Sequence, residues 1–394
     1  MPNTLNPTNK ICIKLVKCNK DVSRFIQVPK HLYKGNPFWI APLNLLLRNQ
    51  LNPKRNPVFQ YITAAFWVAY DESGLPIGRI SAQINREHLR IHHPTEGHFG
   101  FLEANSQETM AALVNTAESW LSEKGMTQMT GPYNLSIYEE ELGILVDGFD
   151  SRPYMMMPYH FKHYKDWMTA LGFTKAKDLL AFEYSTNKPT SKKLSRVIEK
   201  LSNANPSKDT LILRQLNQSE YNSEFMSSFA LFNRAWNKNW GHIDFDASYQ
   251  RYFAKIVKLI VDPRLCISTF LNGTKVGFAY ALPNLNDMIA DLKGNLFPLG
   301  AIKFIYRYLF NKPQSARLIL AGISPHIQNT YQGASVFMQM IQKLRCHCLK
   351  LGIKKMELSW ILEDNDSVTK FIMLEKENLT TKRYRIYTKP IPSP

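Results

Sequence analysis

The sequence predicts an α/β fold with mixed sheets, built twice in one chain of 394 residues. A two-strand hairpin pattern occurs in each half, and a strand and a long amphipathic helix follow each hairpin. Each of these helices ends at a glycine, the residue preferred just past a helix C-terminus. This length also suits two domains better than one. We place the domains at 1–190 and 191–394, joined by the Ser/Thr/Lys/Pro segment near 185–193.

The hairpins begin the repeated unit. Residues 65–85 and 265–284 each read as two apolar strands around a polar turn, and each turn carries Gly-x-x-x-Gly. The glycines are Gly74 and Gly78 in the first half and Gly273 and Gly277 in the second. Repetition at one spacing favours a tandem over the alternative of two unrelated α/β domains.

The remaining elements follow in the same order in both halves. Apolar residues recur with helical spacing over about 106–124 and 334–350, and Gly125 and Gly352 end these runs. The first half then predicts strand 97–104 before its long helix, and strand 126–131, helix 159–171 and strand 179–184 after it. The second half predicts strand 317–324 before its long helix, and strand 355–362, helix 366–377 and strand 383–387 after it. A short helix over 194–201 starts the second half.

The composition indicates a folded cytoplasmic protein. Hydrophobic residues make up 44% of the chain and aromatic residues 12%, enough for real cores, and only the first ten residues read as a loose arm. We find no signal peptide and no apolar run long enough to span a membrane. Five cysteines without a CxxC pair indicate reduced thiols.

The net charge of +17 suits an anionic partner, either a membrane surface, a nucleic acid or a polyphosphate cofactor. The basic residues are dispersed, which is more typical of a solvated surface. The stretch 296–310 is apolar but contains Lys303 and Arg307. It either lies in a membrane interface and admits a lipid amine, or forms a helix buried against the sheet. Peripheral contact with the inner membrane is therefore one expectation.

The stretch 317–365 predicts a phosphate site, because a strand, a short polar loop and a helix N-terminus point unpaired N–H groups at the loop. Its order and residue choice resemble the acyl-CoA core of the GCN5-related N-acetyltransferase (GNAT) superfamily. The strings GPYNLSIYEEELGILVDGF at 131–149 and ELSWILEDN at 357–365 are similar to a bacterial family of two-domain GNAT-like acyltransferases that includes the bacterial ceramide synthases. The resemblance implies tandem GNAT folds. It also implies N-acyl transfer from acyl-CoA or an acyl carrier protein to a small-molecule or lipid amine, in some members a sphingoid base.

The resemblance also implies the donor-binding residues. The superfamily pattern Gln/Arg-x-x-Gly-x-Gly/Ala falls on 328–333, and the first half carries no such loop. The residues expected to hold the donor are Ile323, Gln328, Asn329, Thr330, Tyr331, Gln332, Gly333, Ala334 and Asn365. Tyr331 stands where the first glycine belongs, and a left-handed tyrosine would cost roughly 1–2 kcal/mol. Either the loop takes another path, or the donor is held less by its pyrophosphate, as an acyl carrier protein would allow.

Four residues are candidates for catalysis. Glu363 would act as base, although capping of the next helix is an equal alternative. Tyr331 would act as acid, because Ile372 occupies the place of the usual tyrosine. His88 is a second candidate base, and Glu140 belongs to the acidic triplet 139–141 that fits the family pattern. His88 and His92 would share a helix face if their segment is helical, but without a third ligand or an HExxH motif we expect no metal.

Two other functions stay open. Tandem GNAT domains also transfer amino acids from aminoacyl-tRNA, and the positive charge would suit tRNA, although nucleic acid is the less favoured partner. The altered loop would also suit a lipid-binding protein that kept the fold without catalysis.

Overall fold

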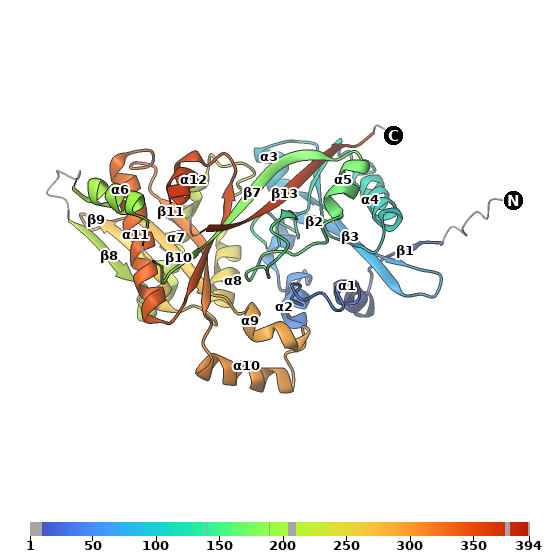
Figure 1. Ribbon diagram of the computed structural model, residues 1–394. Helices are drawn as coiled ribbons and strands as arrows, with labels where there is room; N and C mark the ends of the chain where they lie inside the picture. The colour runs from blue at the N-terminus through green and yellow to red at the C-terminus, as the bar shows by residue number, and fades with distance from the viewer. Residues whose placement is uncertain (1–9, 140, 189, 204–209, 375–378, 393–394) are drawn as a thin grey trace.

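The computed structural model describes residues 10–139, 141–188, 190–203, 210–374 and 379–392. Within them the strands join in one 13-stranded mixed sheet with helices on both faces (Figure 1). The strand order is β1-β2-β3-β4-β5-β13-β7-β12-β11-β10-β9-β8, and β6 pairs with β13 beside this path. The fold class predicted from the sequence is confirmed. The expected loose arm lies outside the described residues, except for its tenth residue.

The first half contains the predicted elements in their predicted order, together with helices and strands that were not predicted, and the helix expected at 159–171 begins only at Tyr164. It consists of β1 (Cys12–Leu15), α1 (Asn19–Leu32), α2 (Asn44–Gln50), the 3-10 helix η1 (Pro57–Gln60), β2 (Ile62–Tyr70), β3 (Pro76–Asn85), α3 (Arg86–Ile91), β4 (Glu96–Ala104), α4 (Gln107–Ser122), β5 (Gln128–Gly131), β6 (Ile144–Asp147), α5 (Tyr164–Ala170) and β7 (Thr174–Ser185). β2 and β3 form the predicted hairpin.

The second half follows the same scheme. It consists of α6 (Lys192–Asn203), β8 (Leu211–Gln215), η2 (Gln218–Glu220), α7 (Tyr221–Trp236), α8 (Ala247–Val257), η3 (Pro263–Leu265), β9 (Cys266–Leu271), β10 (Thr274–Pro283), α9 (Asn286–Ile289), η4 (Ala290–Leu292), α10 (Leu299–Phe310), β11 (Ser315–Ile323), α11 (Tyr331–Lys350), β12 (Lys355–Leu362), α12 (Asp366–Ile372) and β13 (Leu379–Pro390). β9 and β10 form the second predicted hairpin.

Each half contains one pair of parallel strands that are hydrogen-bonded over only a few residues and then separate. β4 pairs with β5 only from Glu96 to His98, and β11 pairs with β12 only from Ser315 to Leu318. Both leading strands continue beyond these points. A wedge therefore opens between the two strands of each pair, at the carboxyl end where α/β proteins place their ligands.

The last strand of each half pairs within the other half. β7 lies between β13 and β12, and β13 lies between β5 and β7. In Figure 1 these two strands run side by side across the middle of the molecule. The division of the chain at 190/191 stays a prediction, and cutting there would separate β7 from both of its neighbours.

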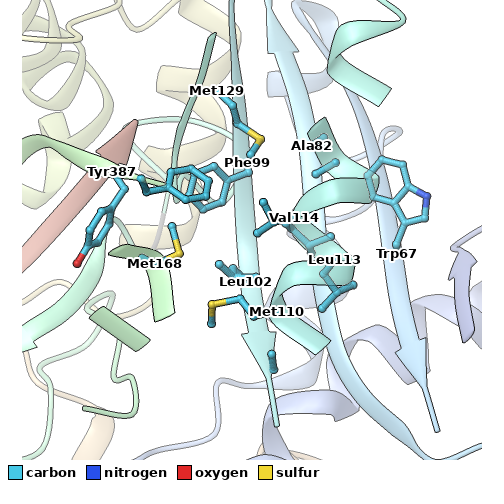
Figure 2. Packing of buried hydrophobic residues seen from close by; sticks show 14 of the residues in the cluster. Trp67, Ala82, Phe99, Leu102, Met110, Leu113, Val114, Met129, Met168 and Tyr387 are labelled. Atoms are coloured by element: carbon cyan, nitrogen blue, oxygen red, sulfur yellow. The ribbon is translucent and has the colours of Figure 1, made fainter. Parts of the chain in front are cut away.

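Helices cover both faces of each half-sheet and supply its core. In the first half, Met110, Leu113 and Val114 of α4 pack against Phe99 and Leu102 of β4 (Figure 2). α1 and α2 cover the opposite face. In the second half α11 covers one face, and α7 and α8 cover the other.

The structure decides between the two interpretations of the apolar stretch 296–310. α10 projects from the body at the bottom of Figure 1, and most of its large apolar side chains are exposed. The buried-helix alternative is therefore wrong. No helix within the described part of the chain is long and apolar enough to cross a membrane.

Candidate functional site

A row of buried polar side chains crosses one face of the first half-sheet, where an apolar core would be expected. The row consists of Arg79, Ser81, Gln83 and Asn85 on β3 and His98 and Glu103 on β4. Arg79 lies opposite Glu103 in the strand register, and Gln83 lies opposite His98. Buried polar groups must be compensated and are costly to retain. The row therefore marks a site, with one cluster at each of its ends.

The first cluster is centred on Glu103. The hydroxyls of Tyr33 and Tyr164 donate to Glu103 Oε2 over 2.9 and 3.0 Å. Burial raises the pKa of Glu103 to about 7, although Arg79 and the two tyrosines act in the opposite direction. A carboxyl group with a pKa near neutrality can take up and release a proton at physiological pH.

Glu141 and Arg79 complete this cluster. Burial raises the pKa of Glu141, and the side chain of Asn134 donates to its Oε2 over 3.2 Å. The Arg79 guanidinium lies 5.1 Å from the ring centre of Phe25 and donates to the backbone oxygen of that residue over 3.3 Å. Arg79 Nε is buried and has no hydrogen-bond partner within the described part of the chain. It therefore remains available to an acceptor atom of a ligand.

A small pocket opens onto this cluster, with a volume of about 20 Å³ and so room for about one water molecule. Its lining residues are Ile26, Pro29, Lys30, Trp39, Pro42, Leu47, Arg79, Glu103, Glu141, Pro158, Tyr159 and His160. Burial, with the nearby Arg79, lowers the pKa of His160 to about 3, so this ring is neutral. Two basic side chains, Arg79 and Lys30, and two carboxyl groups, Glu103 and Glu141, line the pocket, so their charges balance when both carboxylates are ionised.

The second cluster is formed by His88, Glu96 and His98. His88 Nε2 lies 2.6 Å from Glu96 Oε2, and the hydroxyl of Thr130 donates to the other oxygen of Glu96. Burial lowers the pKa of His98 to about 3, and His98 Nε2 has no hydrogen-bond partner among the described residues. One ligand atom from each of the three side chains lies within 4.8 Å of the others, so these residues could hold a metal ion.

Sequence reasoning missed this grouping. It paired His88 with His92 and found no third ligand. Their rings do lie 5.0 Å apart, but His92 Nε2 is 2.6 Å from the backbone oxygen of His242 in the other half. The partners of His88, Glu96 and His98, come instead from β4, which pairs with the strand that leads into α3.

The predicted donor loop forms a compact turn. The Thr330 hydroxyl accepts from Gly333 N over 3.1 Å and so caps α11. Gln328 Nε2 donates to Ile323 O over 2.9 Å. A Cβ atom on Gly333 would lie 2.0 Å from Ile327 O, so the close approach of these two backbone segments requires a glycine.

One expectation about this loop needs correction. Tyr331 is the first residue of α11 and does not take up the left-handed conformation. That conformation belongs to Asn329, with φ of 59°, and asparagine tolerates it better than most residues. The loop therefore makes its left-handed turn at Asn329 rather than at Tyr331. The Tyr331 side chain is 80% exposed at the helix N-terminus.

The structure places the other candidate residues apart from this turn. Lys175 Nζ contacts Glu363 Oε2 at 2.9 Å, and Asp178 N donates to Glu363 Oε1 over 3.1 Å, which ties Glu363 to β7. Asn365 caps α12 by accepting from Val368 N. Within the loop, Ile323 pairs with β10, and Ala334 N donates to Thr330 O. Glu140 lies outside the described residues.

Protein groups occupy both wedges of the sheet. In the first half, Tyr133 N donates to Phe99 O and Asn134 Oδ1 accepts from Phe101 N, each over 2.7 Å. In the second half, Trp236 Nε1 donates to Ala321 O over 2.9 Å. Space for a substrate at either wedge would therefore require these groups to move.

The architecture is that of tandem GNAT proteins. A tandem GNAT protein from the clavulanic acid biosynthesis pathway matches with a TM-score of 0.54 at 12% identity, over 97% of this chain and 99% of that one. A GCN5-related glucosamine N-acetyltransferase region of a fungal multi-domain GH3 β-N-acetylglucosaminidase matches with a TM-score of 0.56 at 11% identity. That match covers 98% of this chain but only 38% of the fungal chain. Comparison with protein-family models gives no match.

Sequence similarity gives the family. The chain is 34% identical over 381 residues to the bacterial ceramide synthase of Caulobacter vibrioides (strain NA1000 / CB15N), which covers 95% of this chain and 96% of that protein. The chain therefore belongs to the family of two-domain GNAT-like acyltransferases that includes this protein, and it is an acyltransferase.

Proposed function

We propose that this acyltransferase moves a long-chain acyl group from a thioester, carried by CoA or an acyl carrier protein, to a lipid amine of the sphingoid type. The name of the Caulobacter relative supports the acceptor class. The observation that carries the proposal is the buried Glu103, with its pKa of about 7, facing a pocket beside Arg79 and Glu141.

The charges of the pocket suit the head group of an amino alcohol. An ammonium group would lie against the carboxylates of Glu103 and Glu141, and Arg79 Nε–H would donate to a neighbouring hydroxyl oxygen. We assign the base to Glu103 rather than to Glu363 or His88. Glu363 and His88 are already engaged in charge-assisted hydrogen bonds, to Lys175 and Glu96 respectively.

The reaction then needs few groups. Glu103 takes one proton from the ammonium group, and its carboxylate is held in place by the hydroxyls of Tyr33 and Tyr164. The neutral amine nitrogen attacks the thioester carbonyl carbon, so that an N–C bond forms and the C–S bond breaks. The thiolate leaves and takes up the second amine proton, so no separate acid is needed. Tyr331, exposed at the N-terminus of α11, stays a candidate for contact with the donor.

The donor is proposed to lie against the loop before α11, because a helix N-terminus favours phosphate groups. Gln328, Asn329, Thr330, Gln332 and Gly333 form this turn, with Ile323 and Ala334 at its ends. Asn365 stays a more distant candidate on α12. Contact with the inner face of a membrane belongs to the same proposal, since a long-chain amine resides in lipid.

The test is an acylation assay with purified protein, a long-chain amino alcohol and matched acyl-CoA and acyl-carrier-protein donors, read by mass spectrometry. We expect an amide product with at least one donor and a loss of about 100-fold or more in Glu103→Gln. Glu123→Gln, at an exposed site after α4, is the matched control. Absence of product with every donor and chain length, or full activity of Glu103→Gln, would refute the proposal. Transfer from aminoacyl-tRNA instead would support the alternative function.

A further inference from the structure

The outer face of α10 is apolar, and no other described part of the chain covers it. Leu299, Ile302, Ile305, Leu309 and Phe310 are between 57% and 70% exposed. Phe297, just before the helix, is 70% exposed and extends the same surface. Scattered single apolar residues are normal on a protein surface, but a contiguous patch on one helix marks an interaction site.

The inner face of α10 is correspondingly polar at one end, so the helix is inverted relative to an ordinary surface helix. Arg307 points inward, where Nη1 donates to Met288 O over 2.7 Å and Nη2 donates to Asp291 Oδ2 over 2.9 Å. Phe304 packs against the small core around Ile289. These contacts hold α10 to the body by its polar residues and direct its apolar residues outward.

The charges around α10 identify what covers this face. Residues 292–356 contain no aspartate or glutamate, and Lys293 and Lys312 are exposed near the helix. Lys303 is also exposed, but its Nζ lies 3.5 Å from Asp291 Oδ2. Aromatic and aliphatic side chains flanked by lysines are the composition of helices that lie in a membrane interface and bind anionic lipid. A second copy of the chain would bring the same positive charges together, which disfavours self-association through this face.

The position of α10 connects this face to the Glu103 pocket. The segment just before the helix is fastened to α2, because Asn44 N donates to Gly294 O over 2.9 Å and Asn44 Nδ2 donates to Asn295 Oδ1 over 2.7 Å. Lys30 and Pro42, which both line the pocket, lie directly against Gly294. Figure 1 shows α10 below α9 and α2.

We propose that the apolar face of α10, with Phe297 and the surrounding lysines, docks the protein on an anionic membrane surface and places the Glu103 pocket next to the bilayer. A lipid amine then passes from the membrane to the pocket with its head group leading and its chain still in lipid. The membrane docking is inferred from the exposed apolar residues of α10 alone. The passage of a lipid amine to the pocket rests on the proposed acyl transfer.

Vesicle co-sedimentation tests the docking without any activity. The full-length protein is mixed with vesicles of phosphatidylglycerol and phosphatidylcholine and with vesicles of phosphatidylcholine alone. We expect binding to the anionic vesicles that weakens with salt. We expect the triple variant Ile302→Ser, Ile305→Ser, Leu309→Ser to reduce it by about tenfold or more. The control triple variant Leu75→Ser, Ile212→Ser, Leu259→Ser changes three exposed apolar residues elsewhere and should bind as the wild type does.

Two outcomes would overturn the docking. One is equal vesicle binding by the α10 variant and the control. The other is absence of binding to anionic vesicles by the wild type; a wild-type dimer that the α10 variant dissociates would then assign the face to self-association. Thermal unfolding checks that both variants are folded. If the wild type acylates amines, the α10 variant should lose activity on vesicle-embedded long-chain amine and keep it on a short water-soluble amine. Failure of all acylation with intact docking would refute the proposed function alone.

Discussion

Replacing Glu103 by glutamine should make the protein more stable at alkaline pH while it loses activity. Burial raises the pKa of Glu103 from 4.5 to about 7. Between these two values the folded protein holds a proton on Glu103 that the unfolded chain has released. The stability that this protonated carboxyl contributes is complete below pH 4.5 and is lost as the pH rises through about 7. At about 1.4 kcal/mol per pH unit, the loss amounts to about 3 kcal/mol.

Glutamine has no proton to lose, and its amide oxygen still accepts from the Tyr33 and Tyr164 hydroxyls. The free energy of unfolding of Glu103→Gln, relative to the wild type, should therefore rise by about 3 kcal/mol between pH 4.5 and pH 8. Urea unfolding at a series of pH values measures this difference. The change with pH is the informative quantity, because a constant offset reflects only packing and hydrogen bonding.

Two results would refute this reasoning. A stability difference that does not change with pH would mean that Glu103 titrates alike in the folded and unfolded chain. A difference that shrinks as the pH rises would mean that its folded pKa is lowered. Glu123→Gln is the control, because its exposed side chain should give no such difference. In the acylation assay, kcat/KM of the wild type should rise with pH through about 7, since the base must be ionised.

Three further predictions concern the rest of the molecule. A fragment of residues 1–190 should not fold alone, because β7 would lose both of its neighbouring strands. Mixing it with a fragment of residues 191–394 should restore the secondary structure, measured by circular dichroism. A single fragment that unfolds cooperatively would contradict this prediction. Gly333→Ala should lower the melting temperature, because the added Cβ would clash with Ile327 O. The substitution should also raise KM for the acyl donor more than KM for the amine. An unchanged KM for the donor would argue against this loop as the donor site. Chelation of metal ions with EDTA should leave the acylation activity unchanged, because His88 and Thr130 already hydrogen-bond to the two oxygens of Glu96. A loss of activity that added zinc restores would assign a metal ion to that cluster.

The order of elements was predictable from the sequence, because it depends on local periodicity and on turn glycines. Both hairpins, both long helices and strand 355–362 lie where the pattern predicts them. Local patterns could not predict that β7 and β13, the last strands of the two halves, each pair with strands of the other half. A strand pattern shows that a segment pairs and which face it buries, but it does not specify the partner.

The candidate site was predictable only in part. Gly333 was recognised because a motif places it, and the structure supplies the steric reason for it. Glu103 was missed because it ends a strand that otherwise reads as core. A usable signal was present, since Arg79 is the one charged residue of strand 76–85 and Glu103 the one charged residue of the predicted strand 97–104. A buried charge of this kind needs a partner, but the sequence alone does not show that these two residues face each other.

A comparison of the two halves supports the first half as the place where the amine reacts. The second half also buries an arginine and a carboxyl group, Arg317 and Glu357. There Ser359 Oγ accepts from Arg317 Nε over 2.7 Å and donates to Glu357 Oε1, while Arg317 Nη1 donates to Met155 O over 3.0 Å. That network ties β11 and β12 to a segment of the first half, and such satisfied networks make a structure rigid. Arg79 is equally buried, but its Nε–H lies beside a pocket and has no hydrogen-bond partner among the described residues. Since an unpaired buried donor is costly, a site that retains one is better explained by a ligand that completes it than by the needs of folding.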